Sequence, residues 1–109
     1  MPTTYKVLGQ VNPSATTATT LYTVGAGKSA VVSTIAVCNQ AASAATFRIA
    51  IRPAGATLAA QHYIAYDSTV AANDSTMLTI GVTLATTDII TVYASTATLS
   101  FSAFGSEIS

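Results

Sequence analysis

The stretch that decides the fold class reads Thr46-Phe47-Arg48-Ile49-Ala50-Ile51-Arg52 and alternates large apolar residues with polar or small ones. Successive side chains of a β-strand point to opposite faces, so Phe47, Ile49 and Ile51 share one face and the two arginines share the other. Such alternation is typical of a half-buried strand. We therefore predict a strand here, with its apolar face in the core and its arginines on the outer face.

Outward from this strand, runs of β-branched and aromatic residues alternate with turns rich in Gly, Pro, Asn and Asp, and no long window has the apolar spacing of a helix. The predicted strands lie near Tyr5–Gln10, Thr16–Val24, Ser29–Asn39, Thr46–Arg52, His62–Asp67, Thr76–Leu84, Ile89–Ser95 and Leu99–Phe104. Their number and spacing favour an all-β fold, an antiparallel β-sandwich of about eight strands that is jelly-roll-like, over a closed barrel. A chain of 109 residues is expected to form one domain, 1–109.

Several further strands can be assigned an inner face by the same alternation. The side chains predicted to face the core are Leu78, Ile80, Val82 and Leu84 in one strand, Ile90, Val92 and Ala94 in the next, and Leu99, Phe101 and Ala103 in the last. Two tight turns are also predicted. Gly25-Ala26-Gly27-Lys28 offers glycines for positive φ, and Asp88 can bond its own backbone in the turn that begins at Ala85.

The strand Ser29–Asn39 is apolar on both faces. Val31, Ile35 and Val37 are expected on one face, with Val32, Ala36 and Cys38 on the other. A strand of this kind is expected at the centre of its sheet, covered on both sides, and one cover can be another subunit. Cys38 is accordingly predicted to be a small buried hydrophobic residue.

Charged residues make up only 7% of the chain, and the formal net charge is zero. Nucleic-acid binding is therefore not expected, because it draws on clustered Lys and Arg, and disorder is not expected in a chain that is half hydrophobic. No apolar run is long enough to span a membrane, and the N-terminus lacks the pattern of a signal peptide. Low charge with positive hydropathy suits a protein held in an assembly better than a free monomer.

Catalytic patterns are not found in the sequence, and we expect a protein that is not an enzyme and has no cofactor. Gly27-Lys28-Ser29 resembles the end of a phosphate-binding loop, but the required upstream glycine and following helix are missing. The single histidine, His62, would have to serve any Ser or Cys nucleophile, and is more simply a structural or interface residue. One Cys and one His also exclude a Cys/His zinc site.

The loop from Asp67 to Ser75 is rich in oxygen ligands of the kind that calcium prefers. It lacks the spaced acids of a known calcium loop, so an ordinary polar loop and a cation site are both left open. No metal is assigned.

Candidate interface residues are Arg48, Arg52, His62, Tyr63, Tyr66 and Tyr93. Arg and Tyr concentrate binding energy in protein contacts, because each combines a large area with directed hydrogen bonds. The alternative is that the arginines are solvated and the tyrosines lie at the edge of the core.

Several segments together resemble a known family. They are Leu21-Tyr22-Thr23-Val24-Gly25-Ala26-Gly27-Lys28, Val37-Cys38-Asn39, Phe47-Arg48-Ile49-Ala50-Ile51-Arg52-Pro53, His62-Tyr63-Ile64-Ala65-Tyr66-Asp67, Thr83 through Ser95, and Phe101 through Glu107. This succession of strands and turns, over nearly the whole chain, is similar to small virion proteins of tailed bacteriophages. The family often has Pro where Gly25 stands, and Gly also suits a turn. The resemblance carries no catalytic motif.

The resemblance implies a non-enzymatic β-sandwich that acts by assembling. The favoured function is a structural virion protein, most simply a capsid cement or decoration protein that stabilises the particle by protein–protein contacts. Its expected partners are copies of itself, as a homo-oligomer and most simply a trimer, and the major capsid protein or other virion proteins. A tail or fibre component, or a lectin-like module that binds the host surface, is the alternative. The expected location is the virion, after synthesis in the host cytoplasm.

Overall fold

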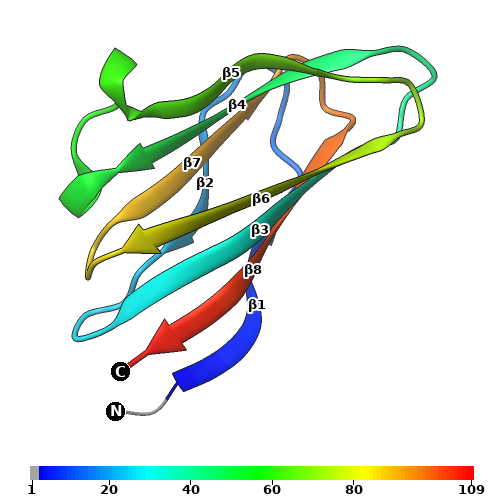
Figure 1. Cartoon of the computed structure of the whole chain (residues 1–109). Coiled ribbons are helices and arrows are strands. Elements are labelled where there is room, and N and C mark those ends of the chain that lie inside the picture. Colours follow the sequence, from blue (N-terminus) through cyan, green and yellow to red (C-terminus); the bar gives the residue numbers. More distant parts are fainter. Residues whose placement is uncertain (1–2) are drawn as a thin grey trace.

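Eight β-strands make up most of the computed structural model, which describes residues 3–109 (Figure 1). They are β1 (Thr3–Val11), β2 (Thr19–Thr23), β3 (Ser29–Asn39), β4 (Ala45–Arg52), β5 (Tyr63–Val70), β6 (Ser75–Leu84), β7 (Ile89–Ala94) and β8 (Leu99–Ile108). Two short 3-10 helices, η1 (Pro53–Gly55) and η2 (Ala60–His62), lie in the connection between β4 and β5. Every predicted strand is present. The largest differences are β8, which continues to Ile108, β5, which continues to Val70, and β2, which begins only at Thr19.

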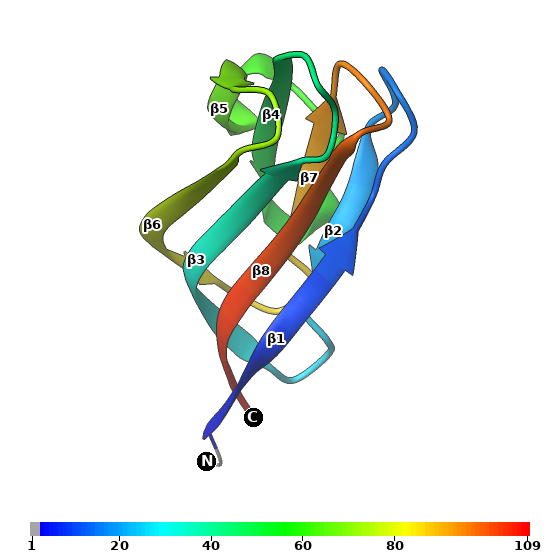
Figure 2. The same cartoon turned by 90° about the vertical axis from the view of Figure 1, so that its right-hand side faces the viewer.

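The strands form two antiparallel four-stranded sheets. Sheet A has the order β1-β8-β3-β6 and sheet B the order β2-β7-β4-β5, and Figure 2 shows them as two layers. Strand β1 pairs with β8, β2 with β7, β3 with β6, and β4 with β5. These are the nested pairs of one long hairpin that turns between β4 and β5 and is rolled into two layers, which is the jelly-roll arrangement. The predicted antiparallel sandwich is therefore confirmed.

The core lies between the sheets and is centred on two phenylalanines. Phe47 of β4 and Phe101 of β8 meet edge to face, with ring centroids 6.1 Å apart and an interplanar angle of 72°. Both are almost completely buried, as are Ile49, Ile90, Val92, Ala94, Leu99 and Ala103. The predicted inner faces of β4, β7 and β8 are confirmed at these positions. Ile51 is only partly buried, against the same cluster.

Each strand at a sheet edge contains a β-bulge, where the edge strand carries one residue more than its neighbour. The bulges lie at Leu8 in β1, at Leu21 in β2, at Ile80-Gly81 in β6 and at two places in β5, Tyr66-Asp67 and Ile64. A bulge breaks strict alternation, so the consecutive residues Leu21 and Tyr22 are both buried. Conversely, the bulge at Gly81, whose φ is +60°, leaves Ile80 exposed. The prediction that Ile80 faces the core was wrong for this reason.

Strand β3 lies between β8 and β6, so its predicted central position is confirmed. An irregularity at Ser33 places Val32 on the inner face with Ile35 and Val37, and the predicted division of its faces was wrong at this point. Cys38 points to the outer face and is exposed, so its predicted burial was also wrong. Burial was inferred from hydrophobicity alone, and the described residues leave that outer face uncovered.

The connection from Pro53 to His62 folds back over the outer face of sheet B. η2 packs on β4 and η1 packs on β7. Ala50, which was expected on the outer face, does point outward but is buried, and its neighbour Thr91 on β7 is buried with it. The connection is therefore an ordered part of the molecule.

The two predicted turns are formed. Gly27 has a φ of +74°, and the Lys28 N–H donates to the Gly25 carbonyl at 3.2 Å, which closes the turn between β2 and β3. Asp88 accepts from the Ala85 N–H at 2.8 Å and, through its other oxygen, from the Ala54 N–H at 2.8 Å. Asp88 thus also anchors the connection between β4 and β5.

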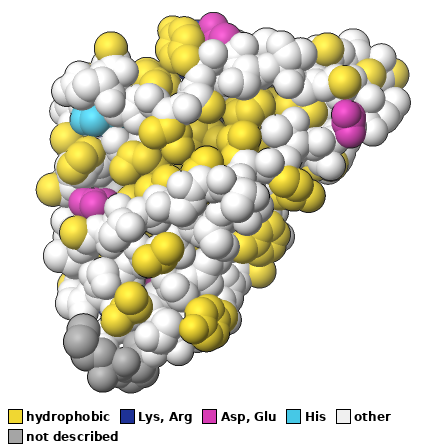
Figure 3. Space-filling view, in the orientation of Figure 1, with side chains coloured by type: hydrophobic (Ala, Val, Ile, Leu, Met, Phe, Trp, Pro, Cys, Tyr) yellow, Lys and Arg dark blue, Asp and Glu magenta, His cyan; other side chains and the backbone are white. Residues whose placement is uncertain are grey.

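The two sheets are held unequally at their two sides. On one side β1 contacts β2 directly. On the other side β5 and β6 diverge from the loop that joins them (Figure 1), and hydrophobic side chains gather between them in the space-filling view of Figure 3. Ala65 of β5 and Leu78 and Val82 of β6 are only partly buried against the core. The core is thus less completely covered at this side of the molecule.

Candidate functional site

Arg48 is the centre of a side-chain cluster on the outer face of sheet B. It lies directly opposite Tyr93 of β7 in the register, and the bulge in β5 places two residues, Tyr66 and Asp67, opposite it on the other side. A regular strand would offer Arg48 a single partner at this point. The bulge therefore allows an aromatic ring and a carboxylate to reach the same guanidinium.

The Arg48 guanidinium lies between two tyrosine rings and is paired with a carboxylate. Its central carbon is 4.1 Å from the ring centroid of Tyr66 and 4.4 Å from that of Tyr93, distances that give cation–π attraction. Its Nε donates to Oδ1 of Asp67 at 2.7 Å, and Nη2 is 3.4 Å from Oδ2. The hydrogen bond to Asp67 raises the pKa of Arg48, against an opposing effect of burial. The guanidinium is therefore fixed in place and its charge is balanced.

Asp67 occupies the left-handed region of backbone space, with φ +52°. Few residues other than Gly adopt this conformation readily, and Asp is among those that tolerate it. The same residue therefore forms the bulge and supplies the carboxylate that binds Arg48. This role of Asp67 was not predicted, because the sequence pattern carries no signal for a bulge.

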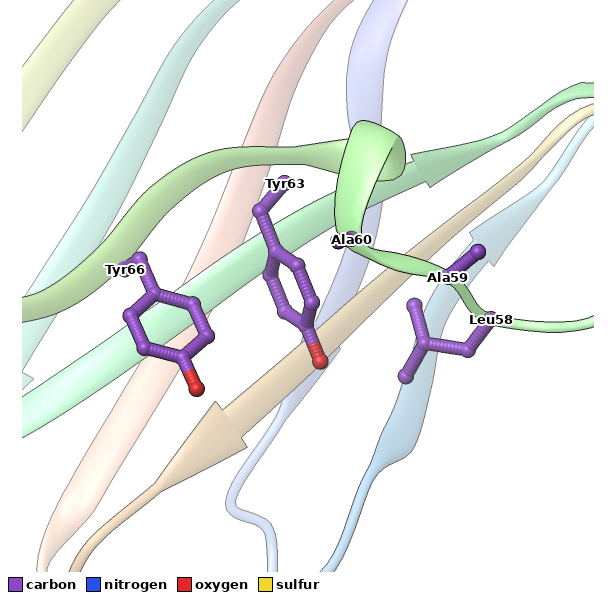
Figure 4. A pocket seen from close by; sticks show the side chains of 5 residues that line it. All are labelled: Leu58, Ala59, Ala60, Tyr63 and Tyr66. Atoms are coloured by element: carbon purple, nitrogen blue, oxygen red, sulfur yellow. The ribbon is translucent and has the colours of Figure 1, made fainter.

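A pocket of about 600 Å³ adjoins this cluster. Its lining residues are Leu58, Ala59, Ala60, Tyr63 and Tyr66. The rings of Tyr63 and Tyr66 meet edge to face with centroids 5.0 Å apart, and in Figure 4 their hydroxyls point in the same direction. The two tyrosines belong to β5. Leu58 and Ala59 precede η2 in the connection, and Ala60 is the first residue of η2. Leu58, Ala59 and Ala60 were not predicted, since a loop position gives no periodic signal.

Arg52 shares the outer face with Arg48 but has a different set of partners. Its Nε donates to the Ala56 carbonyl at 2.7 Å, Nη2 to the Gly55 carbonyl at 3.2 Å, and Nη1 to the Thr91 hydroxyl at 3.3 Å. Arg52 therefore holds the start of the connection between β4 and β5 against sheet B. These contacts are all within the chain, and the predicted interface role of Arg52 stays a prediction.

His62 ends η2 and does not belong to the predicted strand, which begins one residue later. Its Nδ1 accepts a hydrogen bond from the Ala59 N–H at 3.1 Å. Of the six predicted interface residues, the structure thus gathers Arg48, Tyr63, Tyr66 and Tyr93 into one cluster, here called the tyrosine–arginine cluster. Arg52 and His62 shape the connection beside it.

A second polar cluster is formed around Glu107 of β8. The Tyr22 hydroxyl donates to Oε2 at 2.6 Å, Lys6 Nζ donates to Oε1 at 3.2 Å, and Lys28 Nζ lies 3.9 Å from Oε1. The hydrogen bond from Tyr22, followed by that from Lys6, holds the pKa of Glu107 below its usual value. Burial, with the nearby carboxylate, raises the pKa of Tyr22. The cluster ties β1, β2 and β8 together and is satisfied within the chain.

Both aspartates of the predicted loop from Asp67 to Ser75 are engaged with the protein itself, and Asp67 lies within β5. Asp67 binds Arg48, and Asp74 accepts from the Ser75 N–H at 2.8 Å. Among residues 3–109, no group of three or more His, Cys, Asp or Glu side chains is arranged to hold a metal ion. Over the same residues, no helix has the length and apolarity needed to cross a membrane.

Comparison of the chain with protein-family models, with curated protein sequences and with solved structures found no match in any of the three.

Proposed function

We propose that this chain is a structural virion protein of a tailed bacteriophage, and that it acts as a capsid cement or decoration protein. It binds the particle and copies of itself through protein–protein contacts and catalyses no reaction. The observation that carries the proposal is the outer face of sheet A, where the outward-directed residues that the structure describes carry no charged side chain.

The composition of this face follows from the register. Val32, Ile35 and Val37 point inward, which fixes the residues that pair across the outer face. These residues are Tyr5, Val7, Gln10, Val31, Thr34, Ala36, Cys38, Ser75, Met77, Thr79, Thr83, Ser100, Ser102, Phe104 and Ser106. None of them is charged. Tyr5 is 84% exposed and Met77 is 63% exposed, while Phe104 is partly buried between them in the sheet.

This surface shares two features with the centre of a protein interface: it lacks charged side chains, and it contains exposed aromatic and Met side chains. Interface centres are depleted of charged residues and enriched in aromatic residues and Met. Exposed apolar patches on soluble proteins mark contact sites, and here the hydroxyls of Ser and Thr provide hydrogen bonds around the apolar groups. A partner with an equally uncharged face would be accepted without burial of an unpaired ion. This supports self-association of the chain together with a capsid contact.

The proposal is tested on a tailed phage that encodes the chain. Its particles should contain the protein, and particles made without it should lose DNA at a lower temperature and regain resistance when the purified chain is added. Met77→Glu places a charge on the outer face of sheet A and should abolish this rescue. Thr69→Glu places the same charge on an exposed position of sheet B and should rescue normally. The proposal would be refuted if normally assembled particles of this phage did not contain the protein.

Self-association is measured separately by sedimentation of the purified chain. We expect a homo-oligomer, for which the family resemblance implies a trimer, and Met77→Glu should shift it toward monomer. A monodisperse monomer at micromolar concentration would contradict the proposed self-contact.

A tail or fibre component that binds the host surface is a second candidate. The feature that favours it is the tyrosine-lined pocket on sheet B, on the other side of the sandwich from the uncharged face.

A further inference from the structure

We propose that the pocket lined by Tyr63 and Tyr66 binds a neutral saccharide, a function beyond the assembly contact proposed above. Its volume of about 600 Å³ lies within the range of small-molecule sites and leaves room for more than one sugar ring. The site stands on the outer face of sheet B. Should sheet A face the particle as proposed, this pocket would face away from it and remain accessible.

The pocket has an aromatic surface that is already ordered. Tyr66 is 58% exposed, yet its ring is held by the Arg48 guanidinium and by the edge contact with Tyr63. An exposed aromatic side chain that is fixed before binding loses little conformational entropy when a ligand covers it. Leu58 and the methyl groups of Ala59 and Ala60 extend the apolar lining. These features suit a ligand with a flat apolar face.

The polar groups of the pocket match hydroxyl groups. The Tyr63 and Tyr66 hydroxyls point in the same direction (Figure 4), and each can donate and accept a hydrogen bond. Sugar hydroxyls do the same, and a pyranose ring also presents C–H groups that can lie on an aromatic face. The combination of aromatic rings with amphoteric hydroxyls therefore fits a carbohydrate.

The charges of the site favour a neutral ligand. No charged side chain lines the pocket, and Arg48 behind Tyr66 is balanced by its pair with Asp67. A phosphate, sulfate or carboxylate group would find no uncompensated cation. A proline-rich peptide would also fit an aromatic groove, but its backbone offers few hydrogen-bond donors. The two tyrosine hydroxyls can each accept as well as donate, which favours a ligand rich in hydroxyl donors.

The experiment probes the purified full chain with an array of neutral hexose and N-acetylhexosamine oligosaccharides, their sialylated and sulfated counterparts, and proline-rich peptides. We expect binding to neutral oligosaccharides. Tyr66→Ala should weaken it by about tenfold or more. The matched control is Tyr5→Ala, which removes an exposed tyrosine from sheet A and should leave saccharide binding unchanged.

A second measurement does not depend on a variant. In amide NMR spectra of the wild-type chain, the bound oligosaccharide should shift the signals of Ala59, Ala60 and Tyr63, and not those of sheet A. The proposal would be overturned if none of the probes bound at millimolar concentration, or if only the charged sugars or only the peptides bound. It would also be overturned if saccharide binding survived Tyr66→Ala in a folded protein. Tyr66→Ala should still bind the particle, so this outcome is separate from that of the Met77→Glu test.

Discussion

The replacement Phe47→Ala tests the centre of the fold. Phe47 is almost fully buried, comes from sheet B and meets Phe101 of sheet A edge to face. Its removal deletes packing between the two layers and leaves a cavity, and such changes cost about 3–5 kcal/mol. A domain of this length is stable by about 5–15 kcal/mol, so the loss is a large share of the total. With a shift of about 4 °C per kcal/mol, the melting temperature should fall by about 12–20 °C.

The chain provides its own control. Phe104 lies three residues from Phe101 on the same strand but points to the outer face of sheet A and is only partly buried. Phe104→Ala should cost less than Phe47→Ala, because its ring lies on the outer face of sheet A and its removal leaves no closed cavity between the sheets. Both variants are compared by urea denaturation at one low protein concentration, so that oligomer formation does not mask the difference.

A cost for Phe47→Ala no greater than that for Phe104→Ala would refute the assigned register. A shift of one residue in β4 would exchange its two faces and would bring Arg48 into the core. The double variant of Phe47 and Phe101 adds a further check. The two single costs should not add, since both remove the same contact between rings.

Three further predictions concern polar contacts. The pKa of Glu107 is lowered in the folded chain, so its contribution to stability is present above about pH 4.3 and is lost as the pH falls through the folded pKa. Glu107→Gln should flatten this dependence of the urea midpoint on acid pH. An unchanged pH dependence would contradict the Tyr22–Glu107 contact. The pKa of Tyr22 is raised in the folded chain, so its contribution to stability is full below about pH 10 and declines at higher pH. Tyr22→Phe should remove that decline in the urea midpoint. Arg52→Ala should speed hydrogen exchange over residues 53–62 while the strands stay protected, whereas Arg48→Ala should leave that segment unchanged. Equal exchange in both variants would show that Arg52 does not hold the connection.

Alternation predicted the strands well because burial of one face leaves a direct mark on the sequence. The stretch from Thr46 to Arg52 is the clearest case, and its inner residues Phe47 and Ile49 are buried as expected. The same rule failed at Ile80, because a bulge changes which face a side chain takes without changing the residue types around it. It failed at Cys38 because an uncovered sheet face has the same apolar composition as a covered one.

The candidate site was predicted in part for similar reasons. Arg48 and Tyr93 were identifiable as outward residues of regular strands, and they do face each other. The position of the Asp67 carboxylate beside Arg48 depends on the bulge in β5, and the shape of the pocket depends on the path of the connection between Pro53 and His62. Such contacts are set by tertiary structure, and no local pattern reports them.

The bulges also bear on how the protein avoids uncontrolled growth. A jelly roll has four open strand edges, and a regular edge can recruit a strand from another molecule and extend into a fibril. Charged side chains are one common protection of such edges, and they are scarce in this chain. Here β1, β2, β5 and β6 are each interrupted by an irregular backbone step instead. Irregular backbone geometry at these edges thus takes the place of charged side chains in a chain that has few of them.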